Sequence, residues 1–590
     1  MNKYWKYIFP VSSIVLLVAF MGTYFNRFIP IQEGWMQYYS LLMDKGMLPY
    51  KDFYFFTQPL SLFFTQLISK TADGYLVYRV FGMLERVILI IALYALIARK
   101  FSPTATFIAV LTSAFVYNSF NIDILYTYYQ TTLVFFFLSL LCLQRASNSR
   151  NPWVFYLFVG ISASLAFFTK QSNGLAVTVF LFLVMFFYKS QLSKKKQVVF
   201  FVLGWIIPAI LIIGWLVKKH ILLDYISQVF GGISSKGSIL GMLFGFWSRN
   251  YAIFFLIFFL ISSFLVYIIS RKKFLCLKNQ SHSNVALSKF NFFVVFFSSI
   301  FIVMGFFFSP NPNTLSTLNG LAFILLFWVY FPFYSLVFSI IFIGKSWITK
   351  KKLPFDQELI VLIIAALVWT YSVGLSGQLE LYSILLGNAL FIAFLLDRVY
   401  LRWNHYIFMV IVISCLTLLF TSAKKNQLYY SWWGWSDFSH TDNARSEIPA
   451  LEGFNLSADS VRIYDAIYSD ILSFTNPGDF IYTYPHMAMF NYMTGRMQPT
   501  FAPVGYFDVC PDQIAKKDAI TLLKNPPKMI IYMEIPEKNY KFHETTFRNG
   551  QKSGQRDIDA AIHLLIEKYK IVDFYFSEGW NWPIYVYIRQ

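Results

Sequence analysis

Residues 197–217 read QVVFFVLGWIIPAILIIGWLV, and this stretch decides the fold class. It contains no charged side chain, and its length is what an α-helix needs to cross the roughly 30 Å hydrocarbon core of a bilayer. Lysines stand directly on both sides, at 194–196 and at 218–219. An apolar run bounded by cations predicts a helix that spans a membrane.

The same pattern recurs through the first 422 residues. The chain is 57% hydrophobic and 13% charged, against roughly 25% charged in soluble domains. That much apolar surface cannot be buried in a soluble fold, so the sequence predicts an all-α polytopic membrane bundle. We expect about thirteen spans, at residues 7–25, 76–98, 103–118, 129–144, 152–169, 174–188, 197–217, 251–270, 292–309, 320–344, 358–375, 380–396 and 405–422. The first is interpreted as an uncleaved span, because no small-x-small cleavage site follows it.

The formal charge of +19 does not indicate a nucleic-acid partner. A nucleic-acid binder gathers its cations on one face, whereas these cations form short groups between apolar runs, and Lys and Arg accumulate in cytoplasmic loops. The alternation predicts a cytoplasmic N-terminus and an extracytoplasmic C-terminus. The predicted cytoplasmic groups are Lys3 and Lys6; Arg99 and Lys100; Arg145 and Arg150; Lys189 and Lys194–Lys196; Arg271, Lys272, Lys273, Lys278 and Lys289; Lys345 and Lys350–Lys352; Arg398 and Arg402.

The composition changes after residue 422, which predicts two units: a multi-spanning domain over 1–422 and a soluble, extracytoplasmic α/β domain over 423–590. Short β-rich runs alternate there with helical ones. The expected strands are 479–485, 528–533, 571–576 and 583–588, and the expected helices are 459–474, 512–524 and 556–569. The aromatic stretch 428–438 is expected at the membrane surface. The four cysteines, Cys142, Cys276, Cys415 and Cys510, have neither a disulfide framework nor zinc-site spacing.

The most informative polar stretch is the first external loop, residues 29–74, which is too polar to cross a bilayer. A helix over residues 33–45 would place Glu33, Gln37, Ser40 and Asp44 on one face and apolar side chains on the other. Such a helix lies flat in the membrane interface. A second short helix is expected from Pro59 to about residue 70.

This loop resembles the GT-C glycosyltransferases, polytopic enzymes that take a sugar from a polyprenyl-phosphate carrier and include protein O-mannosyltransferases and the aminoarabinose transferase of lipid A. The resemblance rests on Gln32-Glu33-Gly34, on the run from Leu48 to Phe53, and on Gln58-Pro59-Leu60. Family members typically have an Asp-Glu pair where this chain has Gln32-Glu33, which leaves Glu33 as the acid. Weaker similarity extends to Arg79, to Lys170-Gln171 and to residues 476–496.

The resemblance implies the chemistry of specific residues. Attack of an acceptor hydroxyl needs a base, and Glu33 is the candidate, with Asp52 and Asp123 as further catalytic carboxylates. The leaving phosphate needs positive charge, for which Lys170, Arg79 and Lys51 are the candidates. Glu33 and Asp123 together would offer hard oxygen ligands to a divalent cation such as Mg²⁺ or Mn²⁺. The sequence demands no metal, and no other cofactor is expected.

Each candidate also has a structural interpretation. Glu33, Asp52 and Asp123 would then be loop acids, and Lys170 an anchor whose ammonium group reaches out of the bilayer. Glu85 and Arg86 lie inside the second span, where ionisable groups are costly, and we expect them to be paired across the bundle. For His486 and Arg496 we favour surface positions over contacts with an acceptor.

Three functions are weighed. The favoured one is an inverting glycosyltransferase in the bacterial inner or plasma membrane, with a polyprenyl-phosphate-linked sugar as donor, a lipid, glycan or protein as acceptor, membrane lipids around it and no nucleic-acid partner. A transporter or flippase is the alternative, but the spans are nearly free of ionisable residues apart from Glu85 and Arg86. A scaffold is the least favoured, because so many spans are more than an anchor requires.

Overall fold

The structure is a computed structural model that describes residues 5–28, 34–120, 127–186, 190–231, 253–254, 256–257, 259–261, 316–349, 356–374, 381–397, 443–507, 509–548, 550–577 and 580–590. Up to residue 400 the described chain is helical. The helices are α1 (Trp5–Gly22), α2 (Trp35–Asp44), α3 (Pro59–Ser69), α4 (Leu76–Ile97), α5 (Pro103–Phe120), α6 (Tyr128–Ala146), α7 (Pro152–Thr169), α8 (Gln171–Val184), α9 (Lys194–Lys218), α10 (Leu222–Gly231), α14 (Ser316–Ile348), α15 (Gln357–Gly374), η2 (Leu381–Ile384) and α16 (Leu385–Asp397).

The predicted apolar runs match observed helices closely wherever the structure describes them. Within the described residues, the helices long and apolar enough to cross a membrane are Leu76–Ile97, Pro152–Thr169, Lys194–Lys218 and Val329–Ile348. Others are apolar but shorter, such as Gln171–Val184, which covers only about 21 Å at 1.5 Å per residue. The predicted runs 292–309 and 405–422, and most of 251–270, lie outside the described residues. The count of thirteen spans is therefore not established.

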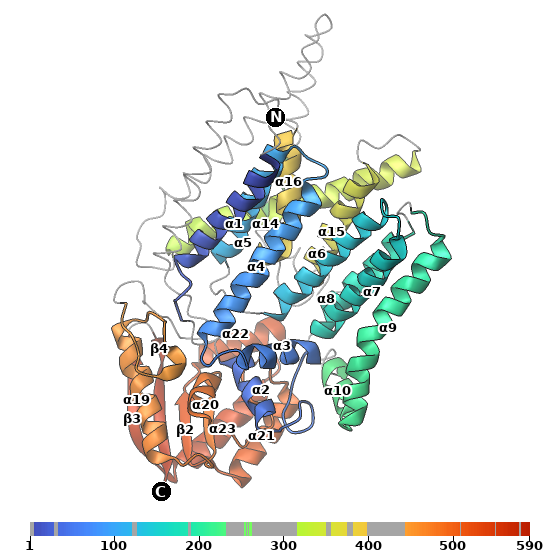
Figure 1. The fold of residues 1–590 in the computed structure, drawn as a ribbon. Coiled ribbons are helices and arrows are strands. Elements are labelled where there is room, and N and C mark those ends of the chain that lie inside the picture. The colour runs from blue at the N-terminus through green and yellow to red at the C-terminus, as the bar shows by residue number, and fades with distance from the viewer. Residues whose placement is uncertain are drawn as a thin grey trace, which may run out of the picture.

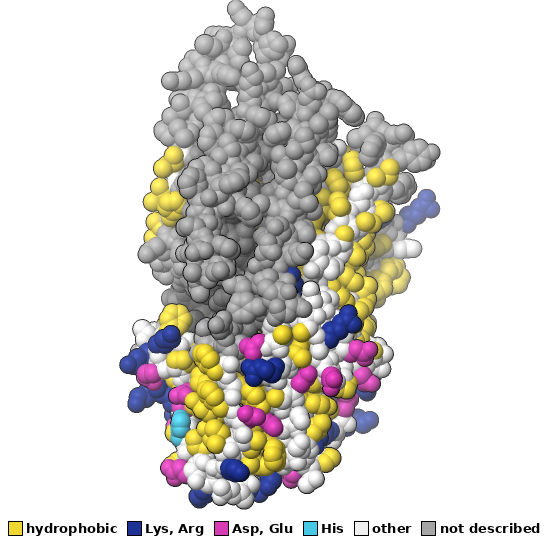
Figure 2. Space-filling model, turned by 90° about the vertical axis from the view of Figure 1, so that its left-hand side faces the viewer, with side chains coloured by type: hydrophobic (Ala, Val, Ile, Leu, Met, Phe, Trp, Pro, Cys, Tyr) yellow, Lys and Arg dark blue, Asp and Glu magenta, His cyan; other side chains and the backbone are white. Residues whose placement is uncertain are grey.

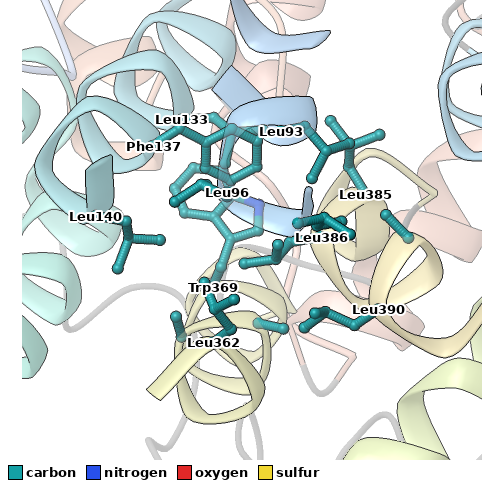
Figure 3. Packing of buried hydrophobic residues seen from close by; sticks show 14 of the residues in the cluster. Leu93, Leu96, Leu133, Phe137, Leu140, Leu362, Trp369, Leu385, Leu386 and Leu390 are labelled. Atoms are coloured by element: carbon teal, nitrogen blue, oxygen red, sulfur yellow. The ribbon is translucent and has the colours of Figure 1, made fainter. Parts of the chain in front are cut away.

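The interior of the bundle is closed by large apolar side chains from α4, α6, α15 and α16. Figure 3 shows Trp369 of α15 surrounded by Leu93 and Leu96 of α4, by Leu133, Phe137 and Leu140 of α6, and by leucines of α16. The Trp369 ring also stacks on Phe136 at 6.0 Å between centroids. This packing fixes the helices of the bundle relative to one another.

Helices α7 and α9 cross closely because each has a glycine at the contact. A Cβ on Gly160 of α7 would lie 2.0 Å from the carbonyl oxygen of Phe201, and a Cβ on Gly204 of α9 would lie 2.0 Å from that of Leu157. Backbones that approach this closely are typical of helices packed through small residues in membranes. The crossing holds α7, which ends at the candidate site, against α9.

The two ends of the helical bundle differ in what covers them (Figure 1). At one end, which we call the loop end, lie α2, α3 and the C-terminal residues. At the other end, Lys100 forms an ion pair with Asp356 at 2.8 Å, and the Asp397 carboxylate accepts a hydrogen bond from the Ser102 backbone. The connection that carries Arg99 and Lys100, both predicted to be cytoplasmic, therefore meets the start of α15 and the end of α16 at the end opposite the loop end.

The C-terminal residues contain a small mixed sheet. Its strands are β1 (Ile481–Tyr484), β2 (Met529–Met533), β3 (Tyr569–Ser577) and β4 (Trp580–Arg589), in the order β1-β2-β4-β3. β1 and β2 are parallel, and the other two pairs are antiparallel. The helical elements around it are η3 (Pro449–Leu451), α19 (Ala458–Phe474), α20 (Ala488–Thr494), α21 (Asp512–Lys524), α22 (Glu537–Phe547) and α23 (Gln555–Ile566).

All four predicted strands and all three predicted helices of this region are present, whereas α20 and α22 were not predicted. On the face shown in Figure 2, the Asp and Glu side chains lie at the end that holds the C-terminal residues, where hydrophobic side chains are also exposed.

The first loop packs between the bundle and the C-terminal sheet (Figure 1), and one buried hydrophobic cluster includes residues of both the loop and the sheet. The Tyr54 N–H donates to the Phe501 carbonyl at 2.8 Å, and the Gln498 N–H donates to the Tyr38 hydroxyl at 3.0 Å. The Lys45 ammonium group donates to the Gly495 carbonyl at 2.8 Å. The loop is therefore held by residues about 450 positions later in the chain.

Asp518 of α21 fixes the C-terminal side of this contact. Its carboxylate accepts hydrogen bonds from the Phe501 N–H at 2.8 Å and from the Ala502 N–H at 3.0 Å. The side chain is buried, and the cost of placing a charge there raises its pKa to about 7, although the two N–H donors act in the opposite direction. Asp518 thus holds the Phe501 carbonyl to which the first loop binds.

We expect Gly204→Ala to destabilise the protein by about 1–3 kcal/mol, because the added methyl group overpacks the α7–α9 crossing. Gly214→Ala is the matched control on the same helix, since a Cβ there meets no atom within 4 Å. Thermal unfolding in detergent, followed by tryptophan fluorescence, measures both variants. Equal midpoints for the two variants would contradict the close crossing.

We expect stability to fall as the pH rises from about 4 to about 7, through the interval between the unfolded and folded pKa values of Asp518. The raised pKa means that the folded state holds this proton more tightly than the unfolded state does. The stabilisation is complete below the unfolded pKa and is lost as the pH passes the folded one. Asp518→Asn cannot titrate, so the pH profile of its unfolding midpoint should be flatter across this interval; parallel profiles for the two proteins would refute the assignment.

Candidate functional site

Lys170 sits at a break between two helices at the loop end. α7 ends at Thr169 and α8 begins at Gln171, and Lys170 between them has extended backbone angles, φ −149° and ψ 117°. Its carbonyl accepts the N–H of Gly174 at 2.9 Å, which starts α8. A Cβ on Gly174 would lie 2.2 Å from the Cα of Phe167, so this glycine allows α8 to fold back tightly on α7. The break directs the Lys170 side chain toward the start of α6.

The Lys170 ammonium group lies on two tyrosine rings. Its Nζ atom is 3.1 Å from the ring centroid of Tyr129 and 4.9 Å from that of Tyr128, within the range of cation–π attraction. Both tyrosines are in the first turn of α6, where the Thr127 side chain caps the helix by accepting from the Gln130 N–H. Lys170 is only 9% exposed. This geometry differs from that of an anchor, whose ammonium group would extend into water.

The residue after Lys170 connects this helix break to the first loop. The Thr57 hydroxyl donates to the Gln171 side-chain oxygen at 3.3 Å, and the Gln171 amide donates to the Phe56 carbonyl at 3.4 Å. The Phe56 ring lies 6.3 Å from that of Tyr128. Lys170-Gln171 therefore lies beside residues 56–57, which lead directly into the predicted motif Gln58-Pro59-Leu60. We call this set the loop–bundle junction, which comprises Phe56, Thr57, Gln58, Tyr128, Tyr129, Lys170 and Gln171.

Helix α10 supports the junction from the other side. The Tyr225 hydroxyl donates to the Gln58 side-chain oxygen at 2.7 Å. Gln228 binds the preceding residues, since its side-chain oxygen accepts the Phe55 N–H at 3.3 Å and its amide donates to the Tyr50 carbonyl. The turn before Pro59 is thus fixed from both α8 and α10.

The other predicted phosphate ligands differ from Lys170 in environment. Arg79, in the first turn of α4, is fully buried; its guanidinium donates to the Arg27 carbonyl and lies 5.5 Å from the Phe454 ring centroid. It therefore joins α4 to the end of α1 and to the C-terminal residues. Lys51 is exposed on the turn of the first loop.

Asp52 shapes that same turn. Its carboxylate accepts the Leu48 N–H at 2.7 Å, and its own N–H donates to the Leu48 carbonyl at 2.9 Å. Tyr50 in this turn has a positive φ of 70°, which a β-branched or bulky residue rarely adopts. The bonds of Asp52 therefore stabilise an unusual backbone conformation, and Asp52 is exposed to solvent.

Glu33 and Asp123 lie outside the described residues, but Gly34, directly after Glu33, is placed. Gly34 has a φ of 124°, and a Cβ there would lie 2.6 Å from the backbone nitrogen of Met489. The chain next to Glu33 therefore contacts α20, within the stretch 476–496 that also carries the resemblance. Among the residues that the structure describes, no group of three His, Cys, Asp or Glu side chains could hold a metal ion.

Glu85 and Arg86 are bound across the bundle, as predicted, and the following partners, among the residues that the structure describes, are neutral side chains. Arg86 donates to the Asn118 side chain of α5 at 2.9 Å and to the Gln130 side chain of α6 at 3.1 Å. The Glu85 carboxylate accepts the Thr131 hydroxyl. These bonds tie α4 and α5 to the first turn of α6, which carries the two tyrosines of the junction.

The favoured surface positions for His486 and Arg496 are wrong, because both side chains are buried. Arg496 donates to the carbonyls of Thr475 and Thr494 and so closes the end of α20 onto α19. The His486 ring stacks on Tyr506, which in turn lies 5.8 Å from Trp35 of α2. Burial lowers the His486 pKa to about 3, so the ring is neutral at physiological pH.

The sequence analysis did not single out several residues that the structure brings to the junction, namely Tyr128, Tyr129, Thr57, Tyr225 and Gln228. A signal was available for the tyrosines, because they come a few residues after Asp123, at the start of the predicted span 129–144. Tyrosines at a membrane boundary are, however, expected as interface anchors in any case. Their contact with Lys170 depends on the tertiary packing of α6 against α7.

One family model matches part of the chain. Residues 58–216 match the family model described as dolichyl-phosphate-mannose-protein mannosyltransferase. The matched segment begins at Gln58 and includes Arg79, Lys170 and Gln171. No curated protein sequence matches the chain.

Several solved structures resemble the fold at low sequence identity. The apo oligosaccharyltransferase of Archaeoglobus fulgidus has a TM-score of 0.48 at 11% identity and covers 100% of this chain and 75% of its own. A structure of the same protein with Zn and sulfate has a TM-score of 0.44 at 12% identity and covers 98% of this chain and 73% of its own. ArnT from Cupriavidus metallidurans, bound to undecaprenyl phosphate, has a TM-score of 0.41 at 10% identity and covers 99% of this chain and 98% of its own. Together with the residues of the first loop, the family-model match over residues 58–216 confirms that this chain resembles the GT-C glycosyltransferases, which use polyprenyl-phosphate donors.

Proposed function

We propose that the protein is a membrane glycosyltransferase that moves a sugar from a polyprenyl-phosphate donor to a lipid, glycan or protein acceptor at the loop end of the bundle. We place this end on the extracytoplasmic side of a bacterial inner or plasma membrane, with the N-terminus in the cytoplasm. Arg99 and Lys100 support this orientation, because they lie at the opposite end of the bundle, and cytoplasmic loops are rich in Lys and Arg.

The observation that carries the proposal is the buried Lys170 ammonium group beside the first loop. The proposed ligand of this cation is the phosphate of a donor whose lipid chain remains in the bilayer, and charge-assisted contacts of this kind are the strong ones. The family model that matches from Gln58 to residue 216 describes enzymes with a lipid-phosphate sugar donor. Lys170 is therefore the principal proposed ligand of the donor phosphate, with Arg79 and Lys51 as the further candidates.

The proposed step is a single displacement. The acceptor oxygen attacks the anomeric carbon, a new bond from that carbon to the acceptor oxygen forms, and the bond to the phosphate oxygen breaks. The acceptor proton moves to the Glu33 carboxylate, and the polyprenyl phosphate leaves with the bonding electrons. Attack opposite the leaving group inverts the configuration of the anomeric carbon.

Positive charge at the phosphate is needed most in the transition state, when the leaving oxygen gains negative charge. The proposed role of Lys170 is to stabilise that charge. The tyrosine rings hold its ammonium group in place before the donor arrives, and a preorganised charge needs no rearrangement during the reaction.

A divalent cation is an optional part of the proposal. Glu33 and Asp123 would bind Mg²⁺ or Mn²⁺ through carboxylate oxygens, the ligands that these ions prefer. Such an ion would supply additional positive charge to the phosphate. Asp52 has a different proposed role, because its carboxylate already binds the Leu48 N–H; it keeps the turn of the first loop in shape.

The transporter alternative is less well supported. A transporter needs coupling residues near the middle of the bilayer. Glu85 and Arg86, the ionisable residues expected there, are bound to neutral side chains of α5 and α6, which supports a structural role.

Purified protein incubated with a panel of radiolabelled polyprenyl-phosphate sugars tests the proposal. We expect release of free polyprenyl phosphate with one member of the panel, and only when a suitable acceptor is present. Movement of an intact donor between leaflets of a vesicle, without release of the carrier, would show a flippase and overturn the proposal.

Glu33→Gln should lower the turnover number by about a hundredfold to ten-thousandfold, the usual contribution of a general base. The substitution keeps the shape of the side chain, so insertion and the unfolding temperature should not change. Asp52→Asn is the control, which should alter stability more than turnover. Near-normal turnover by Glu33→Gln would eliminate Glu33 as the base.

Lys170→Gln should weaken donor binding by about 1.5–3 kcal/mol, the usual value of a hydrogen bond to a charged group, which is about 10- to 150-fold in Kd. Lys70→Gln removes an exposed cation at the end of α3 and is the matched control. Binding of a fluorescent polyprenyl phosphate measures both. If the two variants bind equally well, Lys170 has only a structural role.

A further inference from the structure

Helix α10 is held rigidly against the end of α9. The Ile221 N–H donates to the Leu216 carbonyl and the His220 N–H to the Val217 carbonyl, each at 3.0 Å. This is the bond pattern of a Schellman motif, with His220 at the left-handed position, φ 55°, where glycine is usual. Leu216 and Ile221 are both fully buried, which adds the hydrophobic contact of the motif. The turn therefore sets the direction of α10.

The surface of α10 is divided into three sectors. Tyr225 and Val229, one turn apart, are buried against the first loop and α9. Leu223, Ile226 and Phe230 form a second, apolar sector and are 80%, 46% and 39% exposed.

The third sector is polar, at the positions of Asp224, Ser227 and Gly231, which are spaced by three and four residues and so share a face. Ser227 is exposed, and its hydroxyl donates to the Asp224 carbonyl at 2.9 Å. A helix with one side on protein, one apolar side and one polar side fits a boundary between lipid and water.

The apolar sector of α10 continues the exposed surface of α9. The most apolar window of α9 is 28% buried, the smallest share among the four candidate spans, and Ile210, Leu211 and Val217 are more than half exposed. This surface is where α9 faces lipid. Leu223 follows Val217 after the tight turn, so lipid that covers the end of α9 also reaches α10.

The turn itself carries positive charge. Lys218 and Lys219 are exposed between the apolar surface of α9 and that of α10. Cations at such a position lie at the depth of the lipid headgroups and attract anionic ones.

We propose that α10 is an interfacial helix, with Leu223, Ile226 and Phe230 inserted into the lipid leaflet at the loop end and with Lys218 and Lys219 bound to anionic phospholipid headgroups. Tyr225 binds Gln58, and Gln228 binds the turn at Tyr50. The insertion of α10 into the leaflet therefore sets the position of the loop–bundle junction along the membrane normal. The proposal goes beyond the glycosyltransferase function and does not depend on it.

Nitroxide labels at positions 223, 226 and 227 test the insertion in the full-length protein. Each label is attached to an introduced ketone-bearing residue, so the four native cysteines remain. The protein is reconstituted in phosphatidylcholine vesicles, and collisions of each label with oxygen, which concentrates in lipid, and with a water-soluble nickel complex are compared. We expect oxygen to dominate at 223 and 226 and nickel to dominate at 227. Dominance of nickel at all three positions would overturn the proposal.

The headgroup contact is tested by adding phosphatidylglycerol to the same vesicles. The label at 223 should move deeper, and the combined variant Lys218→Gln, Lys219→Gln should abolish that shift. An equal depth in the two lipid compositions would contradict the role of the lysines. Neither experiment uses a sugar donor, so a failure here is distinct from a failure of the glycosyltransferase assignment.

Discussion

The contact of the buried Lys170 ammonium group with two tyrosine rings is the interaction on which the structure of the loop end depends. The Lys170 ammonium group lies beneath the first loop and faces two tyrosine rings, and those rings are in place only if α6 begins at its observed position. That start depends on the cap at Thr127 and on the bonds that Glu85 and Arg86 make to α5 and α6. The polar residues inside the bundle therefore help to position the side chains that lie beneath the first loop.

The first loop is held by contacts from every side rather than by its own propensity. α2 and α3 are short, and isolated helices of that length are marginal in water. Their stability comes from the junction with α8, from α10, and from the C-terminal residues, where Asp518 keeps the Phe501 carbonyl in place for Tyr54. The C-terminal residues therefore form one side of the environment of the first loop. They contact the loop although they lie about 450 positions later in the sequence.

Periodicity and composition predicted the elements well, because a helix such as α9 or a strand such as β2 depends mainly on local sequence. The resemblance in the first loop drew attention to Lys170-Gln171 and Gln58-Pro59, which the structure brings together. The pairing of Lys170 with Tyr129 could not be predicted, since it depends on how α6 packs against α7. The same reason explains the error at His486 and Arg496. A charged or titratable residue in a soluble segment is usually exposed, and here the first loop and the neighbouring helices bury both.

Photo-cross-linking with a polyprenyl phosphate that carries a diazirine next to the phosphate tests most directly whether this arrangement is a donor site. We expect labelled peptides that contain residues 56–58, 128–129 or 170–171, and competition by unmodified polyprenyl phosphate. Labelling spread along the lipid-facing side of α9, with no effect of the competitor, would contradict it.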